Sequence, residues 1–462
     1  MSHKKETTIL LLSLMVTLGL VGGGLLLFKD EIFPENPAGE KTPSNKSVSD
    51  RISFGEKILT PGDVNPDKTA GVQALANKDY PAAISSLETT LKQQRNNPEA
   101  LIYLNNARIG SDKSYSIVAS IPLGNAPNSA LEILRGIAQA QDAVNSSGGI
   151  KGVPLKVGIA NDNDNPEISQ QIATSLVKNP DVLGVVGPNA SDTTLAAGTV
   201  YNTGKLVAIS PTSTSVKITN FSPYVFRTVP SDFMAARSLA NYMVKDLQKT
   251  QAAVFFNSQS NYSQSLKTEF VSSLSLEGGG VLREFDLSQP NFSAAKSLEQ
   301  AIQEGAEVVM LATNTATLDK GLQVVQVNQK RLNLLGGDDV YNIKTLEVGR
   351  EQASGMVVAV PWHILGETNS DFPQTSRQLW GADVSWRTAM AYDATVALIA
   401  ALEKNPTRSG VQQALSASDF SATGVAGAVK FLPSGDRRAA VQLVKIVKGE
   451  RSRTGYDFEP VP

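Results

Sequence analysis

Small hydroxyl and acidic side chains follow an apolar run near the middle of the chain. The run is Val182–Val186, and the stretch GPNASDTT, residues 187–194, comes directly after it, where a helix is expected to begin. A helix start offers free backbone N–H groups and the positive end of a dipole, so it can hold an anion. Ser, Asp and Thr are also the residues that helix N-caps prefer, which leaves an ordinary cap as the alternative.

The same arrangement, an apolar run followed by hydroxyl, amide or acidic residues, recurs along the chain. The five stretches are 187–194, 207–215, 254–265, 308–317 and 334–342. If their strands belong to two lobes that face each other, these ends line one cleft. Ser191, Thr214 and the N–H groups near Thr212 can donate to a carboxylate there. Asp338 can accept from an ammonium group, and Tyr262 offers a ring and a hydroxyl. This chemistry is complementary to a small zwitterion.

Bond-breaking chemistry is not indicated by these stretches, which hold no base paired with an activated nucleophile. The chain has no cysteine, which excludes disulfides, thiol catalysis and Cys-ligated zinc. Its two histidines, His3 and His363, argue against a His-based triad or a multi-His metal site. Charge is balanced, with 42 Lys and Arg against 44 Asp and Glu, which argues against a nucleic-acid partner. We therefore expect a binding protein, not an enzyme, without a cofactor or a metal ion.

Two acidic motifs resemble metal sites only superficially. The stretch NDNDNP, 161–166, has Pro166 where a calcium loop requires glycine. We interpret it as a turn in which Asn165 caps a helix that starts at the proline. The pair Asp338 and Asp339 has no His or Cys beside it in sequence, so we do not expect it to bind a metal.

Three ring-bearing side chains outside these stretches are interpreted as structural. His363 follows Trp362 after a strand and is expected to pack, or to lie in a crossover, without contacting a ligand. Trp386 and Tyr392 fall in the helical run 386–402 and are expected in the core.

Strands and helices alternate from about residue 114 onward. The strand-length apolar runs are 117–123, 155–159, 182–186, 206–209, 252–256, 308–311 and 332–335. The segments with helical periodicity are 130–144, 166–177, 193–201, 233–247, 263–274, 294–304 and 318–327. This alternation predicts an α/β fold with parallel sheets covered on both faces. The segment is too long for one core, so two lobes are expected, with ligands at the carboxyl ends of the strands.

From about residue 114 to 455 the chain resembles the type I periplasmic binding proteins, in the leucine/isoleucine/valine-binding family of ABC transporter substrate-binding proteins. The resemblance depends on the order and spacing of VVGPNAS (185–191), ISPTSTS (209–215), FRTVPSD (226–232), SNYSQSL (260–266), GGIKGVPLKVGIANDNDNP (148–166) and GVAGAVKFLPSGDRR (424–438). It implies two parallel-sheet lobes, joined by three crossovers, that close over a ligand. We expect domain 113–462 to divide into lobe 1, about 113–231 and 362–420, and lobe 2, about 232–361 and 421–462.

The resemblance also implies the residues that contact the ligand from the first lobe. Ser191 stands at the position that contacts the ligand carboxylate. Thr212 stands at a position that contributes a backbone contact, and Thr214 matches the threonine two residues further on. Ser213 lies between them and belongs to the same expected set.

In the second lobe the resemblance implies contacts from Tyr262 and from Asp338, which would receive the ammonium group. Two departures concern the side-chain pocket. Asn314 stands where the family has a tyrosine, and residues 124–126 lack the aromatic residue expected after the first strand. The shorter acid at 338 and the polar Asn314 favour a polar amino acid, or a related small molecule, over leucine.

The N-terminal part of the chain predicts a membrane anchor. Lys4 and Lys5 precede residues 7–28, which carry no charge and would span about 33 Å as a helix, enough to cross a bilayer. A cleaved signal peptide is the alternative. Residues 1–29 would then be a cytoplasmic tip and an anchor, with the rest of the chain on the extracytoplasmic side of a bacterial inner membrane. Residues 30–66 are rich in Pro, Ser, Lys and Asp, which predicts a flexible linker.

Residues 67–112 contain two amphipathic helical patterns and the start of a third, and they resemble a tetratricopeptide repeat. Gly71, Ala83 and Leu87 fall at the small, small and large packing positions of that motif. Because arrays of such repeats normally need about three units, the segment is either a docking unit for a protein partner or a plain helical spacer.

These observations favour a membrane-anchored extracytoplasmic solute-binding protein. It would capture an amino acid or similar small ligand by lobe closure and deliver it to an ABC-type permease. A membrane-anchored sensor or receptor that uses the same fold without transport is the alternative.

Overall fold

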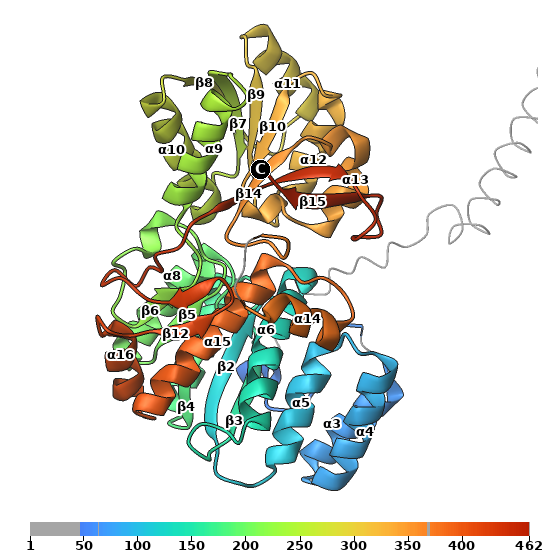
Figure 1. Cartoon of the computed structure of the whole chain (residues 1–462), viewed down its shortest axis with the longest axis vertical. Helices are drawn as coiled ribbons and strands as arrows, with labels where there is room; N and C mark the ends of the chain where they lie inside the picture. Colours follow the sequence, from blue (N-terminus) through green and yellow to red (C-terminus); the bar gives the residue numbers. More distant parts are fainter. Residues whose placement is uncertain (1–46, 63, 367–369, 462) are drawn as a thin grey trace, which may run out of the picture. The chain divides into compact units, whose positions relative to one another are not determined.

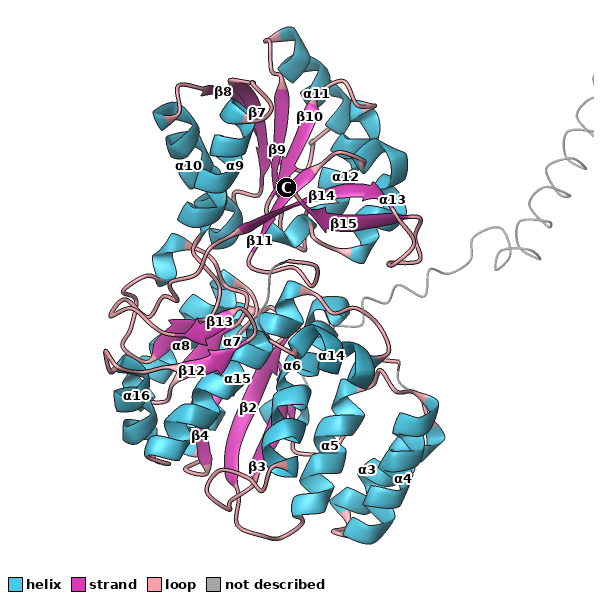
Figure 2. Cartoon of the chain, in the orientation of Figure 1, coloured by secondary structure: helices cyan, strands magenta, loops and turns pink. Residues whose placement is uncertain are grey.

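The computed structural model describes residues 47–62, 64–366 and 370–461. Most of this part of the chain forms two α/β lobes, as the sequence predicts (Figure 1, Figure 2). Within the described residues, the first lobe holds a six-stranded sheet of order β1-β3-β2-β4-β5-β6. Its strands are β1 (Ile52–Ser53), β2 (Tyr115–Ile121), β3 (Leu155–Asn161), β4 (Val182–Val186), β5 (Ala208–Ser210) and β6 (Val225–Arg227). All neighbours are parallel except β1, which is antiparallel to β3.

Helices cover both faces of this sheet, so its strands are buried on both sides. Strand β2 is buried from its second residue to its last. The helices are α6 (Pro127–Ser146), α7 (Pro166–Lys178), α8 (Ser191–Gly204), α14 (Phe372–Trp380), α15 (Trp386–Lys404) and α16 (Arg408–Ser416), with the 3₁₀ turns η1 (Val48–Arg51) and η2 (Val216–Ile218). A small ribbon, β12 (Ala422–Gly424) and β13 (Gly427–Val429), packs on α15.

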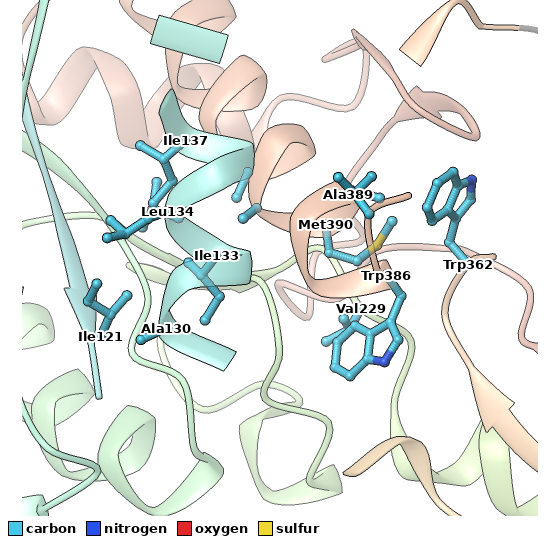
Figure 3. Packing of buried hydrophobic residues seen from close by; sticks show 14 of the residues in the cluster. Ile121, Ala130, Ile133, Leu134, Ile137, Val229, Trp362, Trp386, Ala389 and Met390 are labelled. Atoms are coloured by element: carbon cyan, nitrogen blue, oxygen red, sulfur yellow. The ribbon is translucent and has the colours of Figure 1, made fainter. Parts of the chain in front are cut away.

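The core of the first lobe includes the contact between α6 and α15. Figure 3 labels Ala130, Ile133, Leu134 and Ile137 on α6, and Ala389 and Met390 on α15, all of them buried. Gly136 permits the close approach, because a Cβ there would lie 2.1 Å from the backbone oxygen of Thr388. A side chain larger than hydrogen would therefore force the two helices apart.

The second lobe holds a seven-stranded sheet, again within the described residues, of order β15-β14-β11-β10-β9-β7-β8. Its strands are β7 (Gln251–Phe256), β8 (Gly280–Asp286), β9 (Val308–Ala312), β10 (Asn333–Gly336), β11 (Val357–Val360), β14 (Gln442–Lys448) and β15 (Tyr456–Pro460). The last two are antiparallel to their neighbours. Its helices are α9 (Asp232–Lys245), α10 (Asn261–Leu276), α11 (Ala294–Gln303), α12 (Leu318–Asn328) and α13 (Ile343–Ala353), with the 3₁₀ turn η3 (Asp338–Val340).

Over the described part of the chain, the backbone passes between the lobes three times: after β6, after β11 and after β13. The third crossing lies further along than expected, so the predicted division at residue 420 is wrong. Two ion pairs hold this segment to the first lobe. Arg227 contacts Asp436 at 2.7 Å, and Arg437 contacts Asp393 of α15.

Residues 48–66 are not the flexible linker that their composition suggests. Strand β1 pairs with the edge of the first sheet, and the Phe54 ring packs so closely on Gly158 that a Cβ there would lie 2.7 Å from it. The Asn106 side chain donates hydrogen bonds to the carbonyls of Phe54 and Val157. Backbone pairing at a sheet edge requires no apolar side chains, so composition alone could not reveal this contact. The other part of the predicted linker, 30–46, lies outside the described residues.

The helical segment predicted at 67–112 forms α3 (Pro66–Ala76), α4 (Tyr80–Gln93) and α5 (Pro98–Ile109). Gly71 faces Leu87, and Ala83 and Leu87 are fully buried. Helix α5 packs against α6 and β3, so it extends the first lobe. Its kinship with tetratricopeptide repeats stays a prediction.

Within the part of the chain that the structure describes, no helix has both the length and the apolar character needed to span a bilayer. The predicted anchor, residues 7–28, lies outside the described residues.

Candidate functional site

A cavity of about 710 Å³ lies between the two lobes at the carboxyl ends of their strands. Its size is in the usual range for small-molecule sites. The first lobe contributes Gly124, Asn125, Ser129, Asp164, Pro166, Asn189, Ala190, Ser191, Asp192, Thr212, Trp386 and Arg387. The second lobe contributes Asn257, Gln259, Ser260, Tyr262, Asn314, Thr315, Ala316, Asp338 and Asp339.

Five of the seven residues predicted to contact a ligand line this cavity, and two do not. The five are Ser191, Thr212, Tyr262, Asn314 and Asp338.

Ser213 and Thr214 are buried beside the cavity and are not among the residues that line it. The Ser213 hydroxyl lies 2.8 Å from the hydroxyl of Thr194 and donates to the carbonyl of Asn189 at 3.0 Å. Thr214 accepts the backbone N–H of Asp232 at its carbonyl. Both residues therefore support the loops that carry the lining residues.

Ser191 is the first residue of α8 and is almost fully buried. It is not the ordinary side-chain cap that was the alternative, because Ala190 occupies the N-cap position and no side chain caps this helix. The Ser191 hydroxyl instead accepts the backbone N–H of Ser215 at 3.3 Å. The first backbone bond of α8 runs from Thr194 to Ala190, which leaves the N–H groups of 191–193 outside the bonds of the helix.

Tyr262 and Asp338 form the matching corner in the second lobe. The Tyr262 hydroxyl donates to Asp338 Oδ1 at 2.5 Å and accepts the backbone N–H of Asp339 at 3.4 Å. The hydroxyl can come this close because residue 337 is glycine, where a Cβ would lie 2.5 Å from it. Burial raises the pKa of Asp338, and the tyrosine bond partly opposes that effect.

Asn314 lies at the end of β9, where neighbouring side chains fix its orientation. Its amide oxygen accepts from Asn257 at 2.9 Å and from the Thr317 hydroxyl at 2.8 Å. Asn257 and Asn314 line this side of the cavity, and Thr317 supports Asn314 from behind them.

Three lining acids, Asp164, Asp192 and Asp339, were not among the predicted contacts. Asp164 lies in the turn 161–166, where Asn165 caps α7 as expected by accepting the N–H of Ile168. Asp164 itself accepts from the Asn189 amide at 3.0 Å. Its pKa is raised to about 8, first by burial and then by the nearby carboxylate of Asp162. Burial likewise raises the pKa of Asp339 to about 6. The turn follows a strand directly, so the rule that found the other stretches could have found Asp164.

Trp386 and Arg387 begin α15 and also line the cavity. Trp386 packs in the core cluster as predicted, with the indole visible in Figure 3. The Arg387 guanidinium donates across to the second lobe, to the carbonyls of Tyr341 at 3.0 Å and Asp338 at 3.3 Å. It also pairs with Glu132 at 3.3 Å. No sequence signal marks the two as lining residues, because only the packing of α15 brings its first turn to the cavity.

Polar contacts join the lobes around the cavity. Asp192 at the start of α8 accepts the backbone N–H of Asn261 at the start of α10, at 3.1 Å, and also bonds to its amide. Lys217 donates to the Asn261 amide oxygen at 2.6 Å, and Ser265 accepts the N–H of Val216 at 3.0 Å. The lobes are therefore in direct contact beside the cavity.

Among the described residues, no group of three or more His, Cys, Asp or Glu is placed to hold a metal ion. His363 is buried in the segment after β11, edge-on to Tyr341, and is not among the cavity-lining residues. Burial lowers the pKa of His363 to about 4, so its imidazole is neutral at physiological pH.

Comparison with known proteins gives a consistent family signal. The sequence profile of the periplasmic binding protein family matches residues 123–453, well over half of the chain. The leucine-specific-binding protein of Salmonella typhimurium is 25% identical over 231 residues, which are 49% of this chain and 61% of that protein. The chain spans between 35% and 61% of the length of the first curated relatives that it matches. The names of these relatives describe binding proteins.

Solved structures share the two-lobed fold. A leucine-binding protein from Thermotoga maritima superposes with a TM-score of 0.66 at 20% identity, covering 74% of this chain and 97% of that one. A solute-binding protein of an ABC transporter from Rhodopseudomonas palustris, in complex with p-hydroxybenzoic acid, superposes with a TM-score of 0.65 at 17% identity, covering 75% and 96%. At these identities the likeness shows the fold alone.

Proposed function

The chain belongs to the periplasmic binding protein family, and on that premise we propose that it captures a small amino-acid-like solute between its two lobes. One observation carries the proposal. Ser191 and the start of α8 face the cavity from the first lobe, while Asp338 and Tyr262 face it from the second. A zwitterion needs donors for its carboxylate and an acceptor for its ammonium group, and these two corners supply them.

Closure over the ligand is the binding step in this proposal. A ligand that touches both corners binds the closed arrangement more tightly than an open one, and that difference in affinity shifts the balance toward closure. The polar contacts between Asp192 and Asn261 would form in the same movement. Arg387 would orient the Asp338 segment, because its guanidinium donates to that carbonyl.

We place this activity on the extracytoplasmic side of the membrane, as the family implies, and propose delivery of the solute to an ABC-type permease. We further propose that residues 7–28 anchor the chain and that α3–α5 offer a docking surface for a protein partner. Deletion of 67–112 would remove α5 from the first lobe, so point changes on the exposed face of α4 are the better test of docking. Unchanged solute uptake in such variants would contradict the docking role.

A thermal-shift screen of the full-length purified chain against amino acids and small organic acids tests the central proposal. A specific ligand at 100 times its Kd stabilises the native state by about 2.7 kcal/mol. Ser191→Ala and Asp338→Ala are expected to abolish the shift while leaving the unliganded protein folded. Failure of every amino acid and organic acid to bind would overturn the proposal, as would turnover of any of them.

A further inference from the structure

The cavity holds more acidic groups than a simple zwitterion needs. Its ionisable lining residues, tyrosine aside, are the carboxylates of Asp164, Asp192, Asp338 and Asp339 and the guanidinium of Arg387. The guanidinium is engaged with two carbonyls and with Glu132. An α-ammonium group requires one acceptor, and Asp338 provides it in the proposed function.

The Asp192 carboxylate is already bonded across the lobes to Asn261. Asp164 and Asp339 therefore remain as two acids in excess of what the α-amino and α-carboxyl groups of a ligand explain.

These two acids line the cavity from opposite lobes. Asp339 is close enough to contribute to the raised pKa of Asp164, although less than burial and Asp162 do. Asp339 Oδ1 accepts from Thr315 at 3.3 Å, whereas its Oδ2 is buried and receives no hydrogen bond from the residues that the structure describes. Burial makes both acids costly to ionise, and a cation placed between them would offset that cost.

The rest of the wall does not suit a branched aliphatic side chain. Among the described residues that line the cavity there is no Leu, Ile, Val, Met or Phe. Position 124 cannot supply an apolar group, because a Cβ there would lie 2.4 Å from the Asn163 amide oxygen.

We propose that the ligand is an amino acid whose unbranched side chain ends in a cation, of the lysine, ornithine and arginine class, with that cation held between Asp164 and Asp339. This inference rests on the proposed function, which supplies the contacts of the α-amino and α-carboxyl groups. A metal ion is disfavoured because the described residues contain no cluster placed to hold one. A plain diamine is disfavoured because it would leave Ser191 and the start of α8 without a carboxylate.

Three related compounds separate these possibilities in calorimetric titrations of the full-length chain at pH 8. Lysine has both cations and the carboxylate, norleucine lacks the side-chain cation, and cadaverine lacks the carboxylate. Lysine is expected to bind about 10- to 100-fold more tightly than either of the others, the range for hydrogen bonds to charged groups. Leucine or norleucine binding as tightly as lysine would overturn the inference and leave the proposed function standing. Tighter binding of cadaverine, or competition by Ca²⁺, would also overturn it.

Two variants test the assigned acids. Asp164→Asn and Asp339→Asn are each expected to weaken lysine binding about 10- to 100-fold and to leave norleucine binding unchanged or stronger. The matched control is Asp181→Asn, an exposed aspartate that precedes β4 at the opposite end of the strand from the cavity. Equal losses for lysine and norleucine would contradict the role of these acids in selecting the ligand. Absence of binding by all amino acids to the unmodified chain would instead contradict the proposed function itself.

Discussion

Two acids buried in the framework have a partner cation, whereas two half-buried acids that line the cavity form no ion pair among the described residues. Asp393 is paired with Arg437 between α15 and the third crossing, and Glu99 is paired with Lys68 between α5 and α3. Asp164 and Asp339 have hydrogen-bond donors but no ion pair among the described residues.

The comparison distinguishes two roles of acidic side chains inside the molecule. Asp393 and Glu99 are each paired with a cation of the chain itself, so they hold elements together without a ligand. Asp164 and Asp339 are available to a cation of the ligand. Burial raises their pKa values because it disfavours the ionised carboxylate.

The largest expected effect comes from turning a framework acid into an unpaired one. Arg437→Met removes the guanidinium beside Asp393, which is fully buried, and is expected to lower the free energy of unfolding by about 3–5 kcal/mol. Urea unfolding of the variant measures this. The double variant Arg437→Met with Asp393→Asn is expected to recover part of the loss, because no buried charge is then left alone. A single variant as stable as the parent chain would contradict the distinction between the two groups of acids.

A smaller effect is expected from pH, acting on the unliganded protein. The pKa of Asp164 is raised to about 8 and that of Asp232 to about 7, so the native state binds more protons than the unfolded chain between pH 4 and these values. Unfolding then releases protons, and the free energy of unfolding falls as pH rises. His363, with its lowered pKa, acts in the opposite direction between about pH 4 and 6.5.

The fall is therefore clearest between pH 6.5 and 8, where it is expected to amount to about 2 kcal/mol. Denaturant titrations at several pH values measure it. Asp164→Asn is expected to flatten the curve, and Asp181→Asn to leave it unchanged. A free energy of unfolding that rises with pH over this window would contradict the raised pKa values of Asp164 and Asp232.

The smallest expected effect concerns Asp192, a cavity acid that has a neutral partner across the lobes. Asn261→Ala removes the hydrogen bond that the Asn261 side-chain amide donates to Asp192. Ligand binding is expected to weaken about 5-fold, because the closed arrangement loses roughly 1 kcal/mol relative to the open one. Thermal stability is expected to change little. The control is Asn291→Ala at an exposed loop position of the second lobe. Unchanged affinity in the Asn261 variant would indicate that this contact does not contribute to closure.

Sequence patterns identified most of the strands that are buried on both faces, but they missed the buried β11 as well as strands at the sheet edges. The apolar runs predicted β2, β3, β4, β5, β7, β9 and β10. Strand β8 carries exposed polar residues at the sheet edge, and β1 has only two residues, so neither gives an apolar run. The same rule, polar residues after an apolar strand, found Ser191, Tyr262 and Asp338 because strand ends of parallel sheets converge on one edge.

By itself the sequence determined that the chain alternates strands and helices, and it showed which strand ends carry polar groups. Both could be predicted because strand burial and turn formation depend on local residue types. Only the tertiary structure decided which of those groups share a cavity. The first turn of α15 reaches it from a distant part of the chain, Ser213 and Thr214 are not among its lining residues, and Asp339 forms no ion pair with the residues that the structure describes. Such neighbourhoods depend on how elements far apart in sequence pack, which no local pattern contains.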